Sequence, residues 1–512
     1  MLTSVSSAGN SGVDGYIVTV ECNAEIGLGK YEIVGLPDAA VKEAKERVRT
    51  ACVNSGFRFP ESELTVNLAP ADRRKEGTGF DLAILLGILG SSGYLGRADL
   101  SDKCFVGELS LSGEVRGVRG VLCMCAAARD AGFKEFYAPE VNAPEAASVE
   151  GIKVYSVRDV HTLTEHLCGK APISPVATNR ELFESSRDEN ALDFADIKGQ
   201  EAAKRAMEIA AAGGHNIILI GPPGTGKSML AKRLPSILPP LTFEEAIETT
   251  KVHSVAGLLP DKVSLLRTRP FRSPHHTMSS ASMVGGGANP VPGEVSLAHN
   301  GVLFLDELPE YNKNVTDALR QPLEDSRVTI TRVNGRITYP SSFMLVCAMN
   351  PCKCGYFGQI PSKCTCKKDD VRRYISRVSG PLLDRIDIEV EMPSLTIDEL
   401  TSKQKGESSA EIRARVLRAR EIAAKRFADM PGIYCNAQIR PGAATDLVNM
   451  SESATALLKK SFDAIGLSAR AYDRIVRVSR TIADLDGSET VEVKHIAEAI
   501  QYRSLDRKYW GN

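Results

Sequence analysis

The chain has 512 residues, of which 43% are hydrophobic and 25% charged, and its formal net charge is −1. This length is too great for one hydrophobic core, so we expect about two to four domains. The near-zero charge excludes a global basic field, so any contact with nucleic acid must come from local basic patches, such as those of an oligomeric ring. The N-terminus lacks the basic and apolar regions of a signal peptide, and the longest apolar run, 82–89, is far shorter than the roughly 20 residues of a membrane helix. We therefore expect a cytoplasmic protein that makes no membrane contact.

The first 168 residues have the pattern of one α/β domain. The strand-like runs are 16–22, 64–68 and 154–157, and the helix-like runs are 39–54 and 80–89. Residues 169–190 contain prolines, serines and mixed charges without a sustained apolar period, so we interpret them as a linker.

A second α/β domain is predicted over 191–395. A helix over 200–212 and a strand over 216–220 precede a glycine-rich loop and another helix, and further strands are expected at 302–305 and 343–348. Strands that alternate with helices predict a parallel sheet with helices on both faces.

Residues 396–512 are predicted to form a helical domain that closes over the second one as a lid. The helices are expected at 411–427, 453–465, 469–485 and 493–502. Apolar residues recur at helical spacing in the third of these and make a core face: Ala471, Ile475, Val478, Ile482 and Leu485.

A phosphate-binding loop follows the strand that ends at residue 220. Its residues fit the pattern G-x-x-x-x-G-K-[ST] and open a helix, which is the context that this motif requires: Gly221, Pro222, Pro223, Gly224, Thr225, Gly226, Lys227 and Ser228. The glycines let backbone amides wrap around phosphate oxygens, and the helix N-terminus favours the anion. We expect Lys227 to reach the β- and γ-phosphates of ATP and the Ser228 hydroxyl to ligate Mg²⁺.

A buried strand over 301–305 ends in two carboxylates, Asp306 and Glu307. Phosphoryl transfer needs a held metal ion and a positioned nucleophile more than it needs covalent chemistry. Asp306 is therefore expected to hold Mg²⁺ and Glu307 to polarise the attacking water. The alternative, two exposed acids at a strand end, is disfavoured by the phosphate loop upstream.

The order and spacing of these motifs resemble AAA+ ATPases, and the resemblance implies three further site residues. Asn350, at the end of the next strand, would be the sensor 1 residue that helps to orient the water. Arg385 would be an arginine finger that acts on ATP bound to a neighbouring subunit, and Arg470 would be sensor 2. Arg474 and Arg477 share a helical face with Arg470 and either join this group or form a solvated basic face. An arginine finger requires a partner subunit, and AAA+ ATPases commonly assemble as hexameric rings.

Several segments are more closely similar to the magnesium-chelatase-like YifB/ComM subfamily of AAA+ proteins. They are 196–200, 269–276, 283–287, 350–356 and 379–387, and the resemblance extends over nearly the whole chain. It implies a hexameric, ATP-driven motor that acts on DNA as a branch-migration helicase during the integration of transforming DNA.

Residues 327–338 alternate in β fashion around Asn334 and Gly335, which is a strong signal for a two-residue hairpin. The segment precedes the sensor 1 strand, where this branch of AAA+ proteins carries a pre-sensor hairpin. Arg332 and Arg336 flank the turn, and in a ring they could grip DNA phosphates in the channel. The alternative is an exposed hairpin with ordinary surface arginines.

The N-terminal domain resembles the proteolytic domain of Lon, an S5 domain 2-like α/β fold, in segments 75–81 and 107–113. Lon-type proteases need a nucleophilic serine and a lysine base. Gly79 stands at the serine position and Leu122 at the lysine position, and Thr78 is one place away from the first. We therefore expect a non-proteolytic relative of that domain.

Four of the twelve cysteines lie within fifteen residues: Cys352, Cys354, Cys364 and Cys366. Four thiolates could close a tetrahedral zinc site, although Cys-x-Cys pairs are tighter than the usual spacing. Free thiols and a redox role are the alternatives. A disulfide framework is not expected in a chain of this length.

Two functions other than a DNA motor are compatible with the motifs. The first is a magnesium-chelatase motor subunit for metal insertion into a tetrapyrrole, which would not need the Lon-like domain. The second is a nucleotide-gated scaffold or regulator that recruits proteins through residues 1–168.

Overall fold

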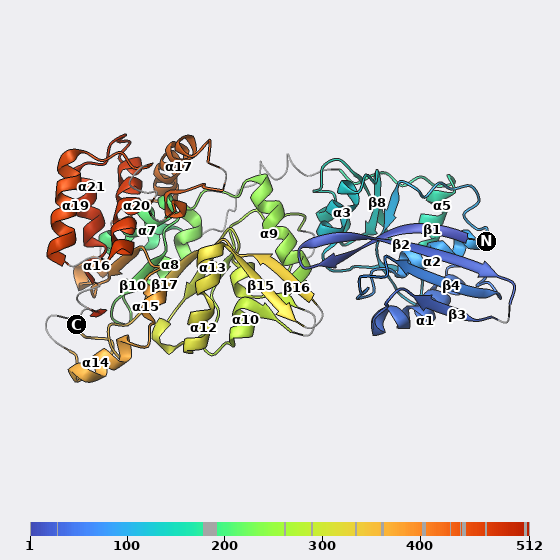
Figure 1. Ribbon diagram of the computed structural model, residues 1–512, viewed down its shortest axis with the longest axis horizontal. Helices are drawn as coiled ribbons and strands as arrows, with labels where there is room; N and C mark the ends of the chain where they lie inside the picture. The colour runs from blue at the N-terminus through green and yellow to red at the C-terminus, as the bar shows by residue number, and fades with distance from the viewer. Residues whose placement is uncertain are drawn as a thin grey trace.

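The computed structural model describes most of the chain and is elongated, with the N-terminal unit (blue) at one end and the C-terminal helices (red) at the other (Figure 1). The described residues are 2–27, 29–177, 192–260, 263–287, 290–332, 335–359, 363–401, 406–430, 432–440, 442, 447–465, 468–505 and 509–510. The predicted linker lies outside them from residue 178 onward.

A seven-stranded mixed sheet forms the N-terminal unit, in the order β3-β4-β2-β1-β5-β8-β9. Its strands are β1 (Leu2–Ser11), β2 (Asp14–Glu25), β3 (Tyr31–Val34), β4 (Glu63–Ala69), β5 (Lys103–Phe105), β8 (Glu135–Pro139) and β9 (Lys153–Val157). β1 and β2 form a long antiparallel hairpin in which Ser11 pairs with Asp14 at the tip. Gly12 at this tip has φ +65°, a left-handed conformation that glycine adopts without strain.

The helices of this unit begin where the sequence supplies caps. α1 (Ala39–Asn54) starts after Asp38, whose side chain accepts a hydrogen bond from the Val41 amide. α2 (Asp81–Ser91) packs on β1 and β2 and is buried almost all round, as its apolar sequence requires. The smaller elements are β6 (Glu108–Leu109), β7 (Val115–Arg116), α3 (Val121–Asp130), α4 (Ala143–Ala146) and α5 (Val160–Leu167).

A five-stranded parallel sheet forms the core of the second unit, in the order β11-β14-β17-β10-β18. Its strands are β11 (Phe271–Arg272), β14 (Val302–Leu305), β17 (Met344–Met349), β10 (Ile217–Ile220) and β18 (Ile388–Glu391). Successive side chains of β10 enter two different hydrophobic clusters, Ile217 on one face and Ile218 on the other. The sheet is therefore covered on both faces, as predicted.

Short helices and two hairpins surround this sheet. The helices are α7 (Glu201–Gly213), α8 (Lys227–Ile237), α9 (Phe243–Ala256), α10 (Ser280–Val284), α11 (Glu294–Leu297), α12 (Lys313–Ala318), α13 (Arg320–Asp325), α14 (Lys368–Ile375), α15 (Gly380–Leu383) and α16 (Ile397–Thr401). The hairpins are β12 (Gly285–Gly286) with β13 (Val291–Pro292), and β15 (Arg327–Arg332) with β16 (Gly335–Pro340). The described residues also include the 3₁₀ turns η1 (Phe194–Asp196), η2 (Leu308–Glu310) and η3 (Asn436–Gln438).

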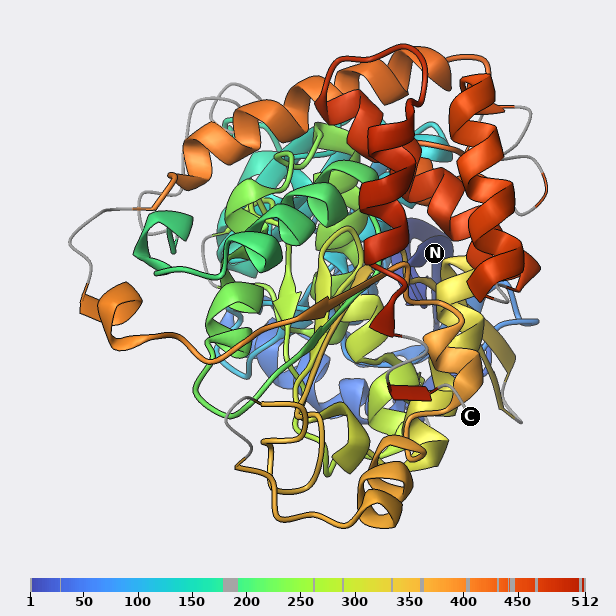
Figure 2. The ribbon, with the colours of Figure 1, turned by 90° about the vertical axis from the view of Figure 1, so that its left-hand side faces the viewer.

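Among the described residues of the C-terminal part, four helices gather beside the core in Figure 2, coloured orange to red. They are α17 (Ser409–Arg426), α19 (Glu452–Ile465), α20 (Ala469–Leu485) and α21 (Val493–Gln501). α17 and α20 pack on α7. The predicted core face of α20 is buried at Ile475, Val478 and Ile482, which join the cluster on one face of the parallel sheet. The lid and the sheet thus share one hydrophobic core.

The two α/β units touch at two places. Leu265 of the second unit enters the cluster around α3, and the Ser254 hydroxyl on α9 donates a buried 2.7 Å hydrogen bond to Glu145 on α4. The tip of the β1–β2 hairpin reaches the β15–β16 hairpin, as Figure 1 shows. A Cβ added at Gly12 would lie 2.6 Å from the Cγ2 of Ile337.

Candidate ATP-binding and hydrolysis site

The phosphate loop leaves the carboxyl end of β10 and enters α8. Gly224 and Gly226 have φ values of +80° and +87°, which glycine adopts without strain. Gly221 has no space for a side chain, because a Cβ there would lie 2.3 Å from the Met392 carbonyl oxygen. The loop amides and the start of α8 therefore form a cradle for phosphate that only this glycine pattern permits.

Lys227 begins α8 and folds back over this cradle. Its Nζ donates hydrogen bonds to the carbonyls of Gly221 (2.7 Å) and Pro222 (2.8 Å) and to Oδ1 of Asn350 (3.2 Å). Burial lowers the pKa of Lys227 to about 8, and Asp306 offsets only part of this effect. The predicted phosphate-binding lysine and the predicted sensor 1 residue are thus in direct contact.

The two predicted magnesium ligands also meet. The Ser228 hydroxyl donates a 2.5 Å hydrogen bond to Oδ2 of Asp306, which follows β14. Ser228 comes after β10 and Asp306 comes after β14, and the carboxyl ends of these parallel strands lie on the same side of the sheet. This topology explains why the two residues meet although they are far apart in sequence. A hydroxyl and a carboxylate are hard oxygen donors of the kind that Mg²⁺ takes beside nucleotide phosphates.

Glu307 stands next to this pair in a left-handed backbone conformation, with φ +52°. Its Oε2 lies 3.4 Å from Nδ1 of His276, and the ring of His276 lies 4.1 Å from that of His275. The sequence did not predict this contact, since a histidine in a loop between strands carries no sign of its partner. His276 is therefore an additional residue of the site, where it holds the carboxylate of Glu307.

Arg385 and Arg470 lie together, but away from the phosphate cradle. Arg470 pairs with Asp384 at 2.6 Å, and Arg385 pairs with Glu324. The Arg385 carbonyl accepts a 2.8 Å hydrogen bond from Asn216, which precedes β10, whereas the phosphate loop follows β10. At roughly 3.3 Å per residue, the four residues of this strand place the two groups about 13 Å apart along the sheet.

A buried ion network supports this arginine group. Arg474 pairs with Asp384 and Asp387, and Arg477 lies 3.8 Å from Asp387. The side chain of Arg474 is only 3% exposed, so the alternative of a solvated basic face is wrong for this residue. Its charge is held by the buried carboxylate of Asp387 and the half-buried carboxylate of Asp384, which helical spacing alone does not reveal.

Asp387 is the anion at the centre of this network. Burial alone would raise its pKa, but the charges of Arg477, His215 and Arg474 outweigh that effect and lower the pKa to about 2. His215 bridges the network to the lid: Nδ1 lies 3.1 Å from Asp387, and Nε2 lies 2.8 Å from the Thr481 hydroxyl on α20. The basic residues beside it line an open cleft of about 1180 Å³: Arg269, Arg385, Arg420, Arg440, Arg470, Arg474 and Arg477.

The predicted pre-sensor hairpin is present, and its register differs from the prediction. Arg332 pairs with Gly335 and Thr331 with Arg336, so Gly335 belongs to β16 and not to the turn. Backbone pairing fixed by the rest of the hairpin overrides the local Asn-Gly signal. Asn334 and the side chain of Arg332 lie outside the described residues, whereas Arg336 is exposed.

The Lon-like positions lie at the ends of two helices. Gly79 precedes α2, and Leu122 is fully buried near the start of α3. The hydroxyl of the neighbouring Thr78 donates to the Glu108 carboxylate. The absence of proteolysis stays a prediction from residue identity.

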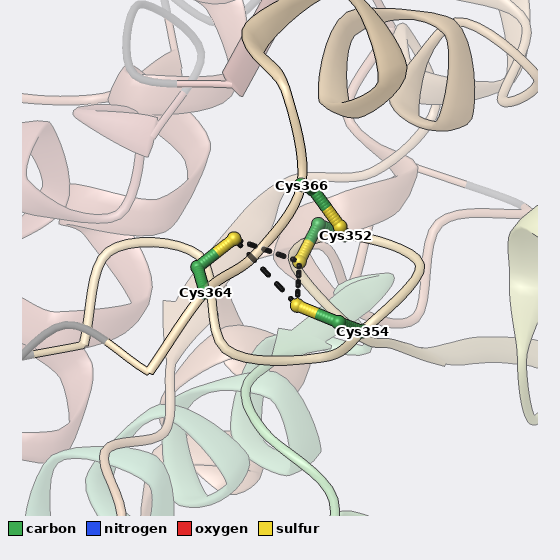
Figure 3. Close-up of side chains that lie close together, drawn as sticks. All are labelled: Cys352, Cys354, Cys364 and Cys366. Atoms are coloured by element: carbon green, nitrogen blue, oxygen red, sulfur yellow. Dashed lines mark hydrogen bonds between the residues drawn. The ribbon is translucent and has the colours of Figure 1, made fainter.

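The four cysteines of 352–366 converge on one point, as Figure 3 shows. Their sulfur atoms all lie within 4.8 Å of one another, and none of the twelve cysteines forms a disulfide. The cluster directly follows Pro351, the residue after Asn350.

Comparison with known proteins identifies the family. The family model described as "Magnesium chelatase, subunit ChlI" matches residues 193–400, "Subunit ChlI of Mg-chelatase" matches 20–142, and "Magnesium chelatase, subunit ChlI C-terminal" matches 406–503. The competence protein ComM of Haemophilus influenzae is 42% identical over 99% of this chain and 98% of its own length. The chain belongs to the ComM/YifB family of magnesium-chelatase-like AAA+ proteins. The uncharacterized protein YifB of Escherichia coli is 42% identical over 97% of this chain and 96% of its own length.

Two shorter similarities concern single parts of this ComM/YifB family member. Lon protease 2 of Bacillus subtilis is 28% identical over 146 residues, 26% of each protein. The Zygotic DNA replication licensing factor mcm6-A of Xenopus laevis is 22% identical over 250 residues, 40% of this chain and 28% of its own length. Together with the family models they confirm the predicted fold class. Membership in an AAA+ family implies ATP and Mg²⁺ as cofactors. Among the described residues no helix has the length and apolarity to cross a bilayer.

Proposed function

We propose that the chain is an ATP-hydrolysing motor whose active sites form between the subunits of a ring. We propose further that this motor acts on DNA as a branch-migration helicase. One observation carries this proposal. The residues proposed to bind ATP lie at the carboxyl ends of the strands of the parallel sheet. The residues proposed to stabilise the transition state lie at the opposite ends of those strands. On this proposal a single copy would hold both halves of a site without joining them.

The first half would bind the nucleotide and prepare the attacking water. Lys227 would give up its hydrogen bonds to the loop carbonyls and bind the β- and γ-phosphates instead. Ser228 and Asp306 would both ligate Mg²⁺. Bound Mg²⁺ supplies neutralisation of charge on the phosphates. Glu307 would accept the proton of a water that Asn350 helps to orient. Because His276 contacts Glu307, that carboxylate must leave the imidazole or work through it.

The second half would act on the nucleotide of the adjacent subunit. Arg385 and Arg470 line the same cleft, and Nε of Arg385 has no hydrogen-bond partner among the described residues. Guanidinium groups bind phosphate oxygens through several N–H donors at once. Repetition of such a head-to-tail contact closes a ring when the rotation per subunit permits. A hexamer is the ring size that we propose.

DNA is the proposed substrate along which this motor moves. The sequence similarity to a DNA replication licensing factor covers 40% of the chain, and the full-length relative from Haemophilus is named a competence protein. The β15–β16 hairpin offers the exposed Arg336, and threonine hydroxyls lie beside it at Thr329 and Thr338. Such groups bind the phosphate backbone without reading its sequence, as a translocating motor requires.

The test is the steady-state ATPase rate with and without single-stranded and forked DNA. We expect DNA to stimulate turnover in the wild type, and Arg332→Ala/Arg336→Ala to lose the stimulation while keeping basal turnover. Arg327→Ala, at the base of the same hairpin, is the matched control and should respond as the wild type does. Basal turnover that no DNA changes would refute the DNA-motor proposal and leave the ATPase proposal standing.

A chelatase motor subunit is the second candidate, because all three matching family models carry that name. It predicts ATP turnover that depends on a porphyrin and on separate partner subunits. Stimulation by these and not by DNA would favour it.

A further inference from the structure

The four-cysteine cluster lies in a segment with little other structure to hold it. Between the end of β17 and the start of α14, the described residues 350–359 and 363–367 contain neither helix nor strand. Irregular segments longer than about 12–15 residues are uncommon inside compact domains unless something fixes them. Cys352 is nevertheless fully buried in the core cluster on one face of the parallel sheet.

The sulfur positions match a bound metal better than a disulfide. The Sγ of Cys352 lies 3.3 Å from that of Cys354 and 3.8 Å from that of Cys364, and Cys354 and Cys364 are 3.6 Å apart. Tetrahedral zinc with Zn–S bonds of 2.3 Å separates its sulfurs by about 3.8 Å, whereas a disulfide needs about 2.05 Å. Cys366 completes the set of four, and Figure 3 shows its sulfur directed toward Cys352.

The surroundings suit a tetrathiolate site. A backbone hydrogen bond closes the loop, since the Gly355 amide donates to the Cys352 carbonyl at 2.9 Å. Four thiolates around one Zn²⁺ leave a net negative charge, and exposed lysines adjoin the ligands in sequence: Lys353, Lys363, Lys367 and Lys368. Four soft ligands and no open position favour a structural zinc over a catalytic one.

We propose that these cysteines bind one Zn²⁺, and that the metal braces the nucleotide site. Cys352 lies two residues after Asn350, which contacts Lys227. Gly355 has φ +87°, and a Cβ there would lie 2.5 Å from Cδ of Pro223 in the phosphate loop. The turn closed by the metal therefore touches the phosphate loop and fixes the start of the segment that carries sensor 1.

Metal analysis of the purified full-length chain tests the site itself. We expect about one zinc per chain, lost in Cys364→Ser and Cys366→Ser and retained in Cys168→Ser, a half-buried cysteine outside the cluster. Should the serine variants fail to fold, Co²⁺ exchanged into the wild type should give the visible absorption of a tetrahedral thiolate complex. Iron in place of zinc, or a folded chain that contains no metal and binds none from added Zn²⁺, would overturn the proposal.

The bracing role rests on the proposed ATPase activity and has its own measurement. We expect removal of zinc by a chelator to weaken binding of a fluorescent ATP analogue about 10-fold, and added Zn²⁺ to restore it. Gly355→Ala should retain its zinc and show weakened binding, because its Cβ displaces the phosphate loop. Nucleotide binding unchanged in both cases would overturn the bracing role, while a chain that binds no nucleotide even with its zinc would overturn the ATPase proposal instead.

Discussion

Mixing two inactive variants should restore ATP hydrolysis if the active site is shared between subunits. Lys227→Ala removes the phosphate-binding half and leaves the arginine half intact, and Arg385→Ala does the reverse. The backbone of Arg385 stands about 13 Å along the sheet from its own phosphate loop, which is farther than an extended arginine side chain reaches. In the proposed ring it would therefore serve a neighbour. Loss of an arginine finger lowers turnover about 10³- to 10⁵-fold, so each variant alone should be nearly inactive.

In an equimolar mixture with random assembly, about one quarter of the interfaces combine an intact phosphate loop with an intact Arg385, whatever the ring size. We thus expect roughly one quarter of wild-type turnover, measured by phosphate release after the variants are mixed and allowed to exchange subunits. The matched control mixes Lys227→Ala with Asp306→Ala, both defective in the same half, and should stay inactive. A Lys227→Ala and Arg385→Ala mixture no more active than its components would refute the shared site.

Three further predictions concern charge and contact. Since burial lowers the pKa of Lys227 to about 8 from its ordinary 10.5, and bound phosphates favour the charged form, nucleotide binding should take up protons between these pH values. Calorimetry in buffers of different ionisation enthalpy measures this uptake, and identical heats would contradict it. Asp387 has its pKa lowered to about 2 from 3.8, so its contribution to stability is complete above pH 3.8 and is lost as the pH falls toward 2. Asp387→Asn should cost about 3 kcal/mol in denaturant unfolding because it removes the buried anion that faces both Arg474 and Arg477. The more exposed Asp384→Asn should cost under about 1 kcal/mol, and equal costs would argue against the buried network. Glu145→Ala leaves the Ser254 hydroxyl without its acceptor between the two α/β units. Amide hydrogen exchange in α9 should therefore become faster, while nucleotide affinity stays unchanged. An unchanged exchange rate would show that apolar contacts alone hold the units together.

The sequence was most informative where local chemistry decides the structure. α1 and α20 span Ala39–Asn54 and Ala469–Leu485 as predicted, because Asp38 and Ser468 cap their first turns and their apolar residues repeat at helical spacing. The meeting of Lys227 with Asn350 also follows from sequence, since parallel strands bring their carboxyl ends to one edge.

Features that depend on tertiary packing were not predictable. The burial of Arg474 depends on carboxylates from another segment, and the contact between His276 and Glu307 joins two loops. The β15–β16 register was set by pairing along the whole hairpin rather than by its turn residues, which placed Gly335 in a strand. The first two contacts depend on a partner that is distant in sequence. The register of the hairpin depends on the sum of many weak strand pairings.

The contact at the tip of the β1–β2 hairpin would couple the N-terminal unit to the proposed motor. Ile337 fills the space beside Gly12, so the β15–β16 hairpin cannot advance in that direction without pushing the tip. β1 is paired with β2 along its full length, and the two strands lie in the middle of the seven-stranded sheet, so we expect them to be stiff. In the proposed motor, a load on the β15–β16 hairpin would therefore be transmitted to that sheet, and a ligand of the sheet would change the resistance that the hairpin meets.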